Sequence, residues 1–278
     1  MESTLSRKEA IQYLKIPEKH FDNYFKSSQE ISAFKKKNRW YFKKAELDRW
    51  KNIRTERSVR LSLKEYEQCF EFAIKMAYSS KASHGTGIRG TRSEVQVADD
   101  FILGILAEHG LKKFLKKKYN ALIQLDTVVH PDHITPQDVD KVKEKGAWRD
   151  PKICVAVKSS KTKSCYNIIP PIEYENDNRK SDVYIFVRVG LPSDHLFRIL
   201  REHSFFKNVK NFLKLDPRFR KIEELNEIMI WICGFNYHSE LDKVKKIPGQ
   251  EFDGYRYVKS VKNMGNSKSD WEKFIKKL

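Results

Sequence analysis

The chain has 278 residues, of which 40% are hydrophobic and 12% aromatic. This composition is sufficient for a folded core and excludes a disordered chain. No apolar run reaches the roughly 18–20 residues that span a bilayer, and the N-terminus lacks the apolar stretch of a signal peptide. The four cysteines are widely spaced and form no Cys-x-x-Cys pair. We therefore expect neither membrane insertion nor export, but a cytoplasmic protein without a disulfide framework or zinc finger.

Basic residues outnumber acidic ones. There are 55 Lys and Arg residues against 37 Asp and Glu, which gives a formal net charge of +18. Residues 1–60 hold sixteen basic and eight acidic residues, a net charge of +8. A surplus of this size predicts a polyanionic partner, most often a nucleic acid. The alternative is a lysine-rich surface that contacts only solvent.

The first 50 residues carry the signals of a compact unit. Ser6 and Glu9 form a capping box that begins a helix, and Pro17 begins a second helix whose aromatic residues recur at helical spacing. Two short apolar runs around a basic tip predict a β-hairpin over residues 31–42. A third helix is predicted over residues 43–51.

The rest of the chain predicts a mixed α/β domain, joined to the first unit by a charged link over residues 52–60. We place the two domains at residues 1–55 and 56–278. A Gly- and Ser-rich loop is predicted at 79–91. Helices are predicted at 63–78, at 92–111 with Gly110 ending it, at 194–213, at 218–226 and from 269. Strands are predicted at 122–129, 139–142, 153–157, 183–189, 228–235 and 255–261.

A distinctive order of signals runs through LSRKEAIQYLKIPEKHFDNYFK and ISAFKKKNRWYFKKAELDRW. It comprises a leading Ser-x-x-Glu-Ala, a Leu before the turn and a terminal Leu-x-x-Trp, in the order helix, turn, helix, basic hairpin, helix. This pattern closely resembles excisionase-type winged helix-turn-helix modules. The resemblance implies that the second helix enters a groove of DNA and that the hairpin, or wing, straddles the backbone.

The resemblance also implies which side chains contact DNA. On the outer face of the second helix, where phosphates or base edges are in reach, are Lys19, His20, Asn23 and Lys26. In the wing, where phosphates are expected, are Lys35, Lys36, Lys37 and Arg39. The alternative is a module that mediates only protein contacts.

The most informative stretch for chemistry is ITPQDVDKVKEKGAWRDPKICVAVKSSK. It predicts a strand, a turn around Gly146 and a second strand that ends in Val-Ala-Val-Lys-Ser-Ser-Lys. Because side chains alternate along a strand, Ala156 and Lys158 share one face. Lys158 can then lie opposite Asp138 or Asp140 on the neighbouring strand.

This arrangement resembles the PD-(D/E)xK nuclease active site. The resemblance implies that an Asp and an acid two residues before a Lys hold Mg²⁺, and that the Lys positions or activates the attacking water. Phosphodiester hydrolysis needs such a hard cation on carboxylate oxygens and a positive group near the scissile phosphate. Asp140 lies sixteen residues before Ala156, a natural length for a hairpin return. Asp138 lies on the same strand face, after Pro136-Gln137, and is also a candidate metal ligand.

The sequence departs from this pattern at Ala156, where the family carries Asp or Glu. In one interpretation the second carboxylate comes from elsewhere, with Glu173 and Glu175 as candidates. In another, the chain is an inactivated variant whose native acid is replaced by Ala. A third interpretation is a plain exposed hairpin that carries a lysine.

Glu94 is a further candidate for the catalytic and metal site. In the helix over 92–111 it falls on a stripe with Ala98, Phe101 and Ile105, where a carboxylate is costly unless it is paired or bound to a metal. Similar nucleases carry a Glu on the helix before the catalytic sheet. The alternative is a carboxylate favoured by the dipole at a helix N-terminus.

The resemblance as a whole implies a type II restriction endonuclease of a restriction–modification system. It would hydrolyse both strands of double-stranded DNA at a specific sequence with Mg²⁺, as a homodimer because the target is two-fold symmetric. The alternatives are a non-catalytic, sequence-specific DNA-binding regulator and a modification-dependent or recombination-type nuclease. A His-x-x-His at His130 and His133 is interpreted as surface histidines rather than a metal site.

Overall fold

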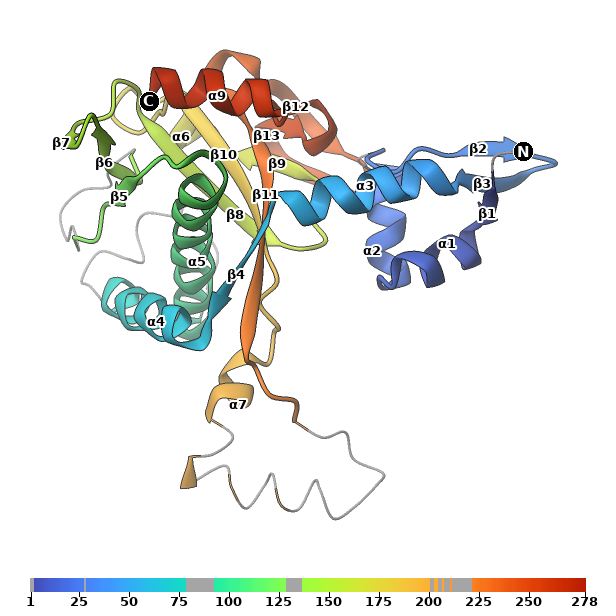
Figure 1. Cartoon of the computed structure of the whole chain (residues 1–278), viewed down its shortest axis with the longest axis horizontal. Helices are drawn as coiled ribbons and strands as arrows, with labels where there is room; N and C mark the ends of the chain where they lie inside the picture. The colour runs from blue at the N-terminus through green and yellow to red at the C-terminus, as the bar shows by residue number, and fades with distance from the viewer. Residues whose placement is uncertain are drawn as a thin grey trace.

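A computed structural model describes residues 3–27, 29–78, 93–128, 137–200 and 222–278, together with residues 203, 204, 207 and 211. Within these ranges the chain forms helices together with one mixed and three antiparallel sheets, which confirms the predicted α/β class (Figure 1). The described residues include no helix that is long and apolar enough to cross a membrane. The predicted loop at 79–91 and both histidines of the His-x-x-His lie outside the described residues.

The centre of the molecule is a four-stranded sheet with the order β4-β11-β10-β8. Its strands are β4 (Ser58–Ser62), β8 (Val155–Lys161), β10 (Val183–Val189) and β11 (Glu227–Tyr237). β10 and β8 are parallel and the other pairs are antiparallel. All seven residues of β10 are buried, as expected for a strand that is covered on both faces.

Two helices cover one face of this sheet, α4 (Leu63–Ala77) and α5 (Glu94–Tyr119) (Figure 1). The prediction that Gly110 ends α5 is wrong, because the helix continues to Tyr119. A Cβ atom at Gly110 would lie 2.3 Å from Cγ2 of Ile230 on β11. This glycine therefore allows the helix and the sheet to approach each other closely, and it does not terminate the helix.

Two smaller sheets flank the central one. The first has the order β12-β13-β9 and the second β5-β6-β7. The strands of the first are β9 (Tyr166–Ile169), β12 (Asp242–Ile247) and β13 (Gln250–Ser260). Those of the second are β5 (Ile123–Leu125), β6 (Val139–Glu144) and β7 (Ala147–Arg149). The predicted turn at Gly146, with φ of +89°, thus leads from β6 into β7 and not into β8.

Short helices complete this part of the chain. They are α6 (Pro171–Tyr174), α7 (His195–Leu200), α9 (Lys268–Lys277) and two 3-10 turns, at His238–Glu240 and Val261–Asn263. Of the helix predicted over 194–213, the structure describes α7 and three further helical residues, at positions 204, 207 and 211. α9 corresponds to the helix predicted from 269. Of the helix predicted over 218–226, only residues 222–226 are described, and they are not helical.

The N-terminal unit has its elements in the predicted order, preceded by one further strand. They are β1 (Thr4–Ser6), α1 (Arg7–Leu14), α2 (Glu18–Asp22), the π-helical turn η1 (Asn23–Ser27), β2 (Phe34–Lys36), β3 (Arg39–Lys43) and α3 (Lys44–Glu56). The capping box is present, because the backbone N–H of Ser6 donates to Glu9 at 2.7 Å. Lys37 and Asn38 form the hairpin turn with φ of +46° and +60°, as a type I′ turn requires.

The charged link predicted over residues 52–60 is regular structure. α3 ends at Glu56, β4 begins at Ser58, and only Arg57 lies between them. The guanidinium of Arg57 donates to the Asn266 side chain at 3.0 Å, and its carbonyl accepts from the N–H of Ile232 at 3.0 Å. The N-terminal unit is therefore joined to the central sheet without a flexible linker.

Candidate functional site

Asp138 is held at the free edge of β8. Its backbone N–H donates to the carbonyl of Val155 at 2.9 Å, and its carboxylate accepts from the N–H of Val157 at 2.6 Å. Among the described residues β8 is the last strand of the central sheet, so no described strand pairs with these backbone groups on that side. The Asp138 side chain thus accepts a hydrogen bond from the edge of the sheet, and this contact places it near Lys158.

Lys158 of β8 forms an ion pair with Glu173 of α6, with 2.6 Å between Nζ and Oε1. The Lys158 ammonium also lies 6.0 Å from the centre of the Tyr184 ring. Ala156, two residues earlier on the same face, is 2% exposed and packs in an apolar cluster with Tyr184 and Tyr257. The carboxylate nearest to the lysine therefore comes from α6 and not from position 156.

Two partly buried carboxyl groups lie near this lysine, those of Glu108 and Asp138. Burial raises the pKa of Glu108 on α5 well above its usual value, the charge of Asp138 raises it further, and Lys158 opposes the shift. Burial also raises the pKa of Asp138, to about 6. The charge of Lys158 and the hydrogen bond from the Val157 N–H lower this pKa, whereas the charges of Glu173 and Asp126 raise it. Four carboxyl groups and one ammonium group therefore converge at this place.

We refer to Glu108, Asp126, Asp138, Lys158 and Glu173 as the acidic cluster. A pocket of about 170 Å³ opens beside it and is lined in part by Glu108 and Asp126. Burial and mutual repulsion raise the pKa values of Glu108 and Asp138, and a bound cation would oppose both effects. Carboxylate oxygens are the ligands of hard cations, and Mg²⁺ commonly uses only one or two of them.

The geometry limits how a metal could be held. Within the described ranges, no three His, Cys, Asp or Glu side chains lie close enough together to hold one metal ion. A cage of three or more protein ligands therefore does not fit the described residues, and a cation here would have at most two of them as ligands, with Asp138 and Glu108 as the candidates.

The structure separates the two candidate aspartates. Asp138 belongs to the acidic cluster, whereas no described contact links Asp140 to Lys158. Asp140 lies at a β-bulge, between the pairs that Val139 and Lys141 form with β5. The hairpin from which Asp140 was predicted does not form, because β6 pairs with β5 and β7.

Glu94 is not on a buried face. It is the first residue of α5, exposed, next to its cap Ser93, which matches the alternative of a carboxylate favoured by the helix N-terminus. The prediction that Glu94 belongs to the metal site is therefore corrected. The helix residue in the cluster is Glu108, which continues the same stripe beyond Ile105.

The two downstream glutamates also differ. Glu175 accepts hydrogen bonds from Tyr255 at 2.9 Å and Tyr257 at 2.6 Å, and it lies 3.6 Å from the ammonium of Lys243. These contacts hold it away from Lys158, with which Glu173 is paired. The geometry thus favours Glu173 as the substitute for an acid at position 156.

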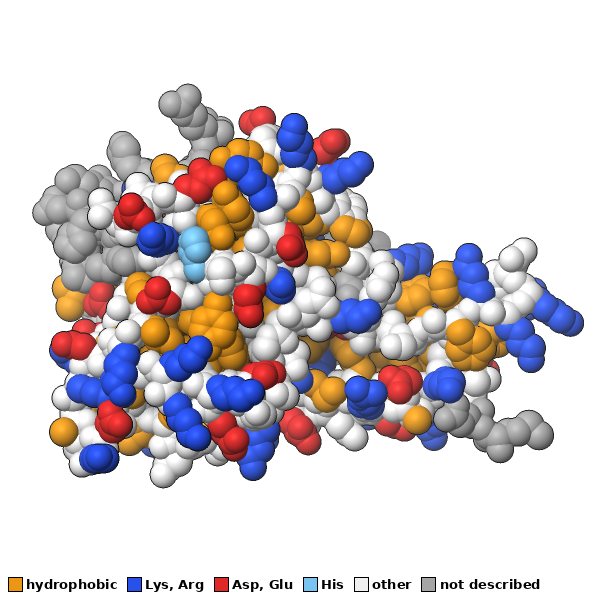
Figure 2. Space-filling view, turned by 90° about the horizontal axis from the view of Figure 1, so that it is seen from above, with side chains coloured by type: hydrophobic (Ala, Val, Ile, Leu, Met, Phe, Trp, Pro, Cys, Tyr) orange, Lys and Arg blue, Asp and Glu red, His pale blue; other side chains and the backbone are white. Residues whose placement is uncertain are grey.

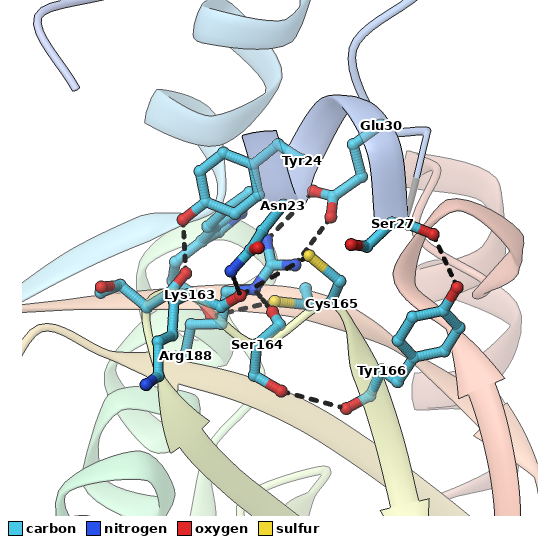
Figure 3. Close-up of polar contacts among 12 residues, drawn as sticks. Asn23, Tyr24, Ser27, Glu30, Lys163, Ser164, Cys165, Tyr166 and Arg188 are labelled. Carbon is cyan, nitrogen blue, oxygen red and sulfur yellow. Dashed lines mark hydrogen bonds and ion pairs between the residues drawn. The ribbon is translucent and has the colours of Figure 1, made fainter. Parts of the chain in front are cut away.

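The second helix of the N-terminal unit faces the central domain (Figure 3). The Asn23 side chain donates to the carbonyl of Lys163 at 3.1 Å, the Tyr24 hydroxyl donates to the carbonyl of Thr162, and the Ser27 carbonyl accepts from Tyr166 at 2.6 Å. The prediction that Asn23 lies on an outer face is therefore wrong.

His20 is half-buried on the same side of this helix. Burial, together with the nearby charge of Arg54, lowers its pKa. Lys19 and Lys26 are exposed, as predicted. The second helix thus offers two lysines to solvent, and not the complete set of four predicted side chains.

A buried ion pair fixes this contact (Figure 3). Arg188 of β10 is fully buried and meets Glu30 with two hydrogen bonds, of 2.7 and 3.0 Å. Its guanidinium lies 4.9 Å from the Tyr24 ring centre and 4.4 Å from that of Trp231. Tyr24, Trp50 and Trp231 belong to one apolar cluster that spans both units. The N-terminal unit is therefore held by a continuous core, and we call this contact the Arg188 interface.

The wing points away from the rest of the molecule (Figure 1). Its basic residues are all exposed, and among the described residues none of them forms an ion pair with a carboxylate. They are Lys35, Lys36, Lys37 and Arg39. Figure 2 shows basic and hydrophobic side chains interleaved over this projection.

Comparison with known proteins adds no assignment. No family model, no curated protein and no solved structure matches the chain.

Proposed function

We propose that the chain is a Mg²⁺-dependent endonuclease that hydrolyses phosphodiester bonds in double-stranded DNA, with the acidic cluster as its active site. The observation that carries the proposal is the attachment of Asp138 to the edge of β8 beside Lys158. It joins a carboxylate, a lysine and the partly buried Glu108 of α5 at one place. This is the combination that phosphodiester hydrolysis requires.

Each residue has a distinct part in this proposal. Asp138 and Glu108 would hold the cation, which when bound would supply positive charge next to the phosphate and favour deprotonation of the attacking water. Lys158 places its ammonium next to the phosphate oxygens. Glu173 orients Lys158 through the 2.6 Å ion pair and supplies the carboxylate that Ala156 lacks.

The wider assignment is a type II restriction endonuclease in the cytoplasm, with the N-terminal unit acting as a winged helix-turn-helix that binds DNA. The net charge of +18 and the surplus of eight basic residues in residues 1–60 support a DNA partner. A homodimer would supply one active site to each strand of a two-fold symmetric target.

A second candidate is a non-catalytic DNA-binding regulator. Ala156 favours it, because this position is filled by a methyl group packed among aromatic rings. The lack of a three-ligand metal set among the described residues favours it as well.

The test is an incubation of the full chain with methylated and unmethylated plasmid DNA, in Mg²⁺ and in EDTA. The nuclease proposal expects discrete fragments only with Mg²⁺. Lys158→Ala should abolish them, and the matched variant Asp140→Asn should not. A gel shift without cutting on either plasmid supports the regulator instead. Cutting of the methylated plasmid alone identifies a modification-dependent nuclease.

A further inference from the structure

The three-stranded sheet of the N-terminal unit has an inner and an outer face. β3 lies between β1 and β2, and Phe42 of β3 is fully buried against Phe21 and Phe25, with ring centres 5.0 Å apart in each case. Since side chains alternate along a strand, Tyr41 and the residues two positions before and after it lie on the opposite, outer face. Those on β3 are Arg39, Tyr41 and Lys43, and the pairing places Phe34 and Lys36 of β2 beside them.

The outer face carries an aromatic pair. The rings of Phe34 and Tyr41 are stacked, with centres 6.1 Å apart and planes inclined by 28°. Phe34 is 38% exposed, although burying such a ring is favourable. The pair therefore presents an apolar, planar surface to solvent.

Cations surround this pair. Lys36 of β2 lies opposite Arg39 of β3. This pair is closer to the hairpin turn than the pair of Phe34 and Tyr41. Lys43 lies on the other side of Tyr41, and β1 contributes Thr4 and Ser6. None of these strand positions on the outer face is acidic. An apolar protein partner would have to desolvate the cations, whereas a polyanion with planar rings matches both features.

The rest of the N-terminal unit is less able to contact bases. Asn23 and His20 of the second helix face the central domain, and the Arg188 interface holds them there. Bases within a duplex are already stacked on each other, so a stacked aromatic pair on a sheet suits bases that are unpaired.

We propose that the outer face of the β1-β3-β2 sheet binds single-stranded DNA, with a base stacked on Phe34 and Tyr41 and phosphates bound by Lys36 and Arg39. This inference rests on the proposed function in taking DNA as the partner. It adds a site for unpaired bases about the wing, separate from the acidic cluster.

The experiment measures binding of a labelled 15-nucleotide single strand and of a duplex of equal length, in EDTA so that cleavage does not contribute. Phe34→Leu keeps an apolar side chain and removes the planar ring. Because stacking contributes about 1–3 kcal/mol per base, this variant should weaken single-strand binding at least about five-fold and leave its salt dependence unchanged. Phe34→Trp, which keeps a ring, should bind as the wild type does.

The charged residues should behave differently. Lys36→Ala with Arg39→Ala should lower the salt slope for the single strand by about 1.4, or roughly 0.7 per lost phosphate contact. The matched control, Lys116→Ala with Lys117→Ala, removes two exposed lysines from α5 and should change single-strand binding much less than the wing pair does.

Two results would overturn the inference. One is single-strand binding by Phe34→Leu within two-fold of the wild type; the other is an equal loss for the duplex, which would indicate phosphate contact alone. Melting temperatures show that the variants are folded. If the binding pattern holds but no DNA is cut with Mg²⁺, the nuclease proposal fails alone. If cutting persists and Phe34→Leu has no effect, only this inference fails.

Discussion

The acidic cluster and the Arg188 interface differ in how their charged groups are compensated. At the interface, a fully buried guanidinium meets one carboxylate with two hydrogen bonds and lies over two aromatic rings. In the cluster, Lys158 pairs with Glu173 and also acts on Glu108 and Asp138, whose pKa values are nevertheless raised. A closely matched pair positions two parts of a fold, whereas carboxyl groups with raised pKa values are typical of a functional site.

The largest expected effect is on catalysis. Asp138→Asn keeps an acceptor for the Val157 N–H but removes the charge that holds the cation. We expect cleavage to fall by at least about 10³-fold, on the scale of losing a main electrostatic contribution, while DNA binding remains. Plasmid cleavage rates and gel shifts measure the two effects. Asp140→Asn is the control, and equal losses in both variants would exclude Asp138 as a specific ligand.

The next effect is on stability at the Arg188 interface. Arg188→Met leaves Glu30 buried without its partner, which should cost about 3–5 kcal/mol of unfolding free energy. Arg188→Met with Glu30→Gln should recover most of this loss, because no buried charge remains. Urea unfolding of the three proteins measures it. A single variant as stable as the wild type would show that the ion pair does not hold the units together.

The acidic cluster should show the opposite response to charge removal. The pKa of Asp138 is about 6 in the folded chain, above its ordinary value, so its contribution to stability is present below pH 4 and is lost as the pH rises through 6. Asp138→Asn should therefore match the wild type at pH 4 and exceed it at pH 7.5, by up to about 3 kcal/mol. Thermal unfolding in EDTA at both pH values provides the measurement, and a variant less stable at pH 7.5 would contradict it.

The smallest effect concerns the source of the second acid. Glu173→Gln removes the charge that pairs with Lys158 and should slow cleavage by about 10- to 100-fold, the scale of a residue that positions a catalytic group. Glu175 instead contacts Tyr255, Tyr257 and Lys243, so Glu175→Gln should cleave DNA at a rate within two-fold of the wild type. If Ala156→Glu instead raises cleavage by orders of magnitude and Glu173→Gln has no effect, the chain is an inactivated variant.

Part of the candidate site could be predicted from the sequence. Lys158 and Asp138 were identified because strand alternation and the spacing of the motif are local properties. Glu108 was missed, although it continues the stripe of Ala98, Phe101 and Ile105 by three residues. Glu108 lies within the helix predicted over 92–111, so continuing the stripe by one step finds it. That its carboxyl group meets Asp138 and Lys158 depends on segments distant in the sequence, which the helical spacing does not encode.

The amino-acid sequence by itself determined what depends on neighbouring residues: the α/β class, the capping box at Ser6, the strand over 183–189 and the basic hairpin. Tertiary structure decided which side chains meet. β8 pairs in parallel with β10, and its free edge binds Asp138. The second helix turns Asn23 toward the sheet because Tyr24 and Trp50 share their apolar cluster with Trp231 of β11. Such pairings depend on burial and hydrogen bonding between distant segments, and local periodicity does not encode them.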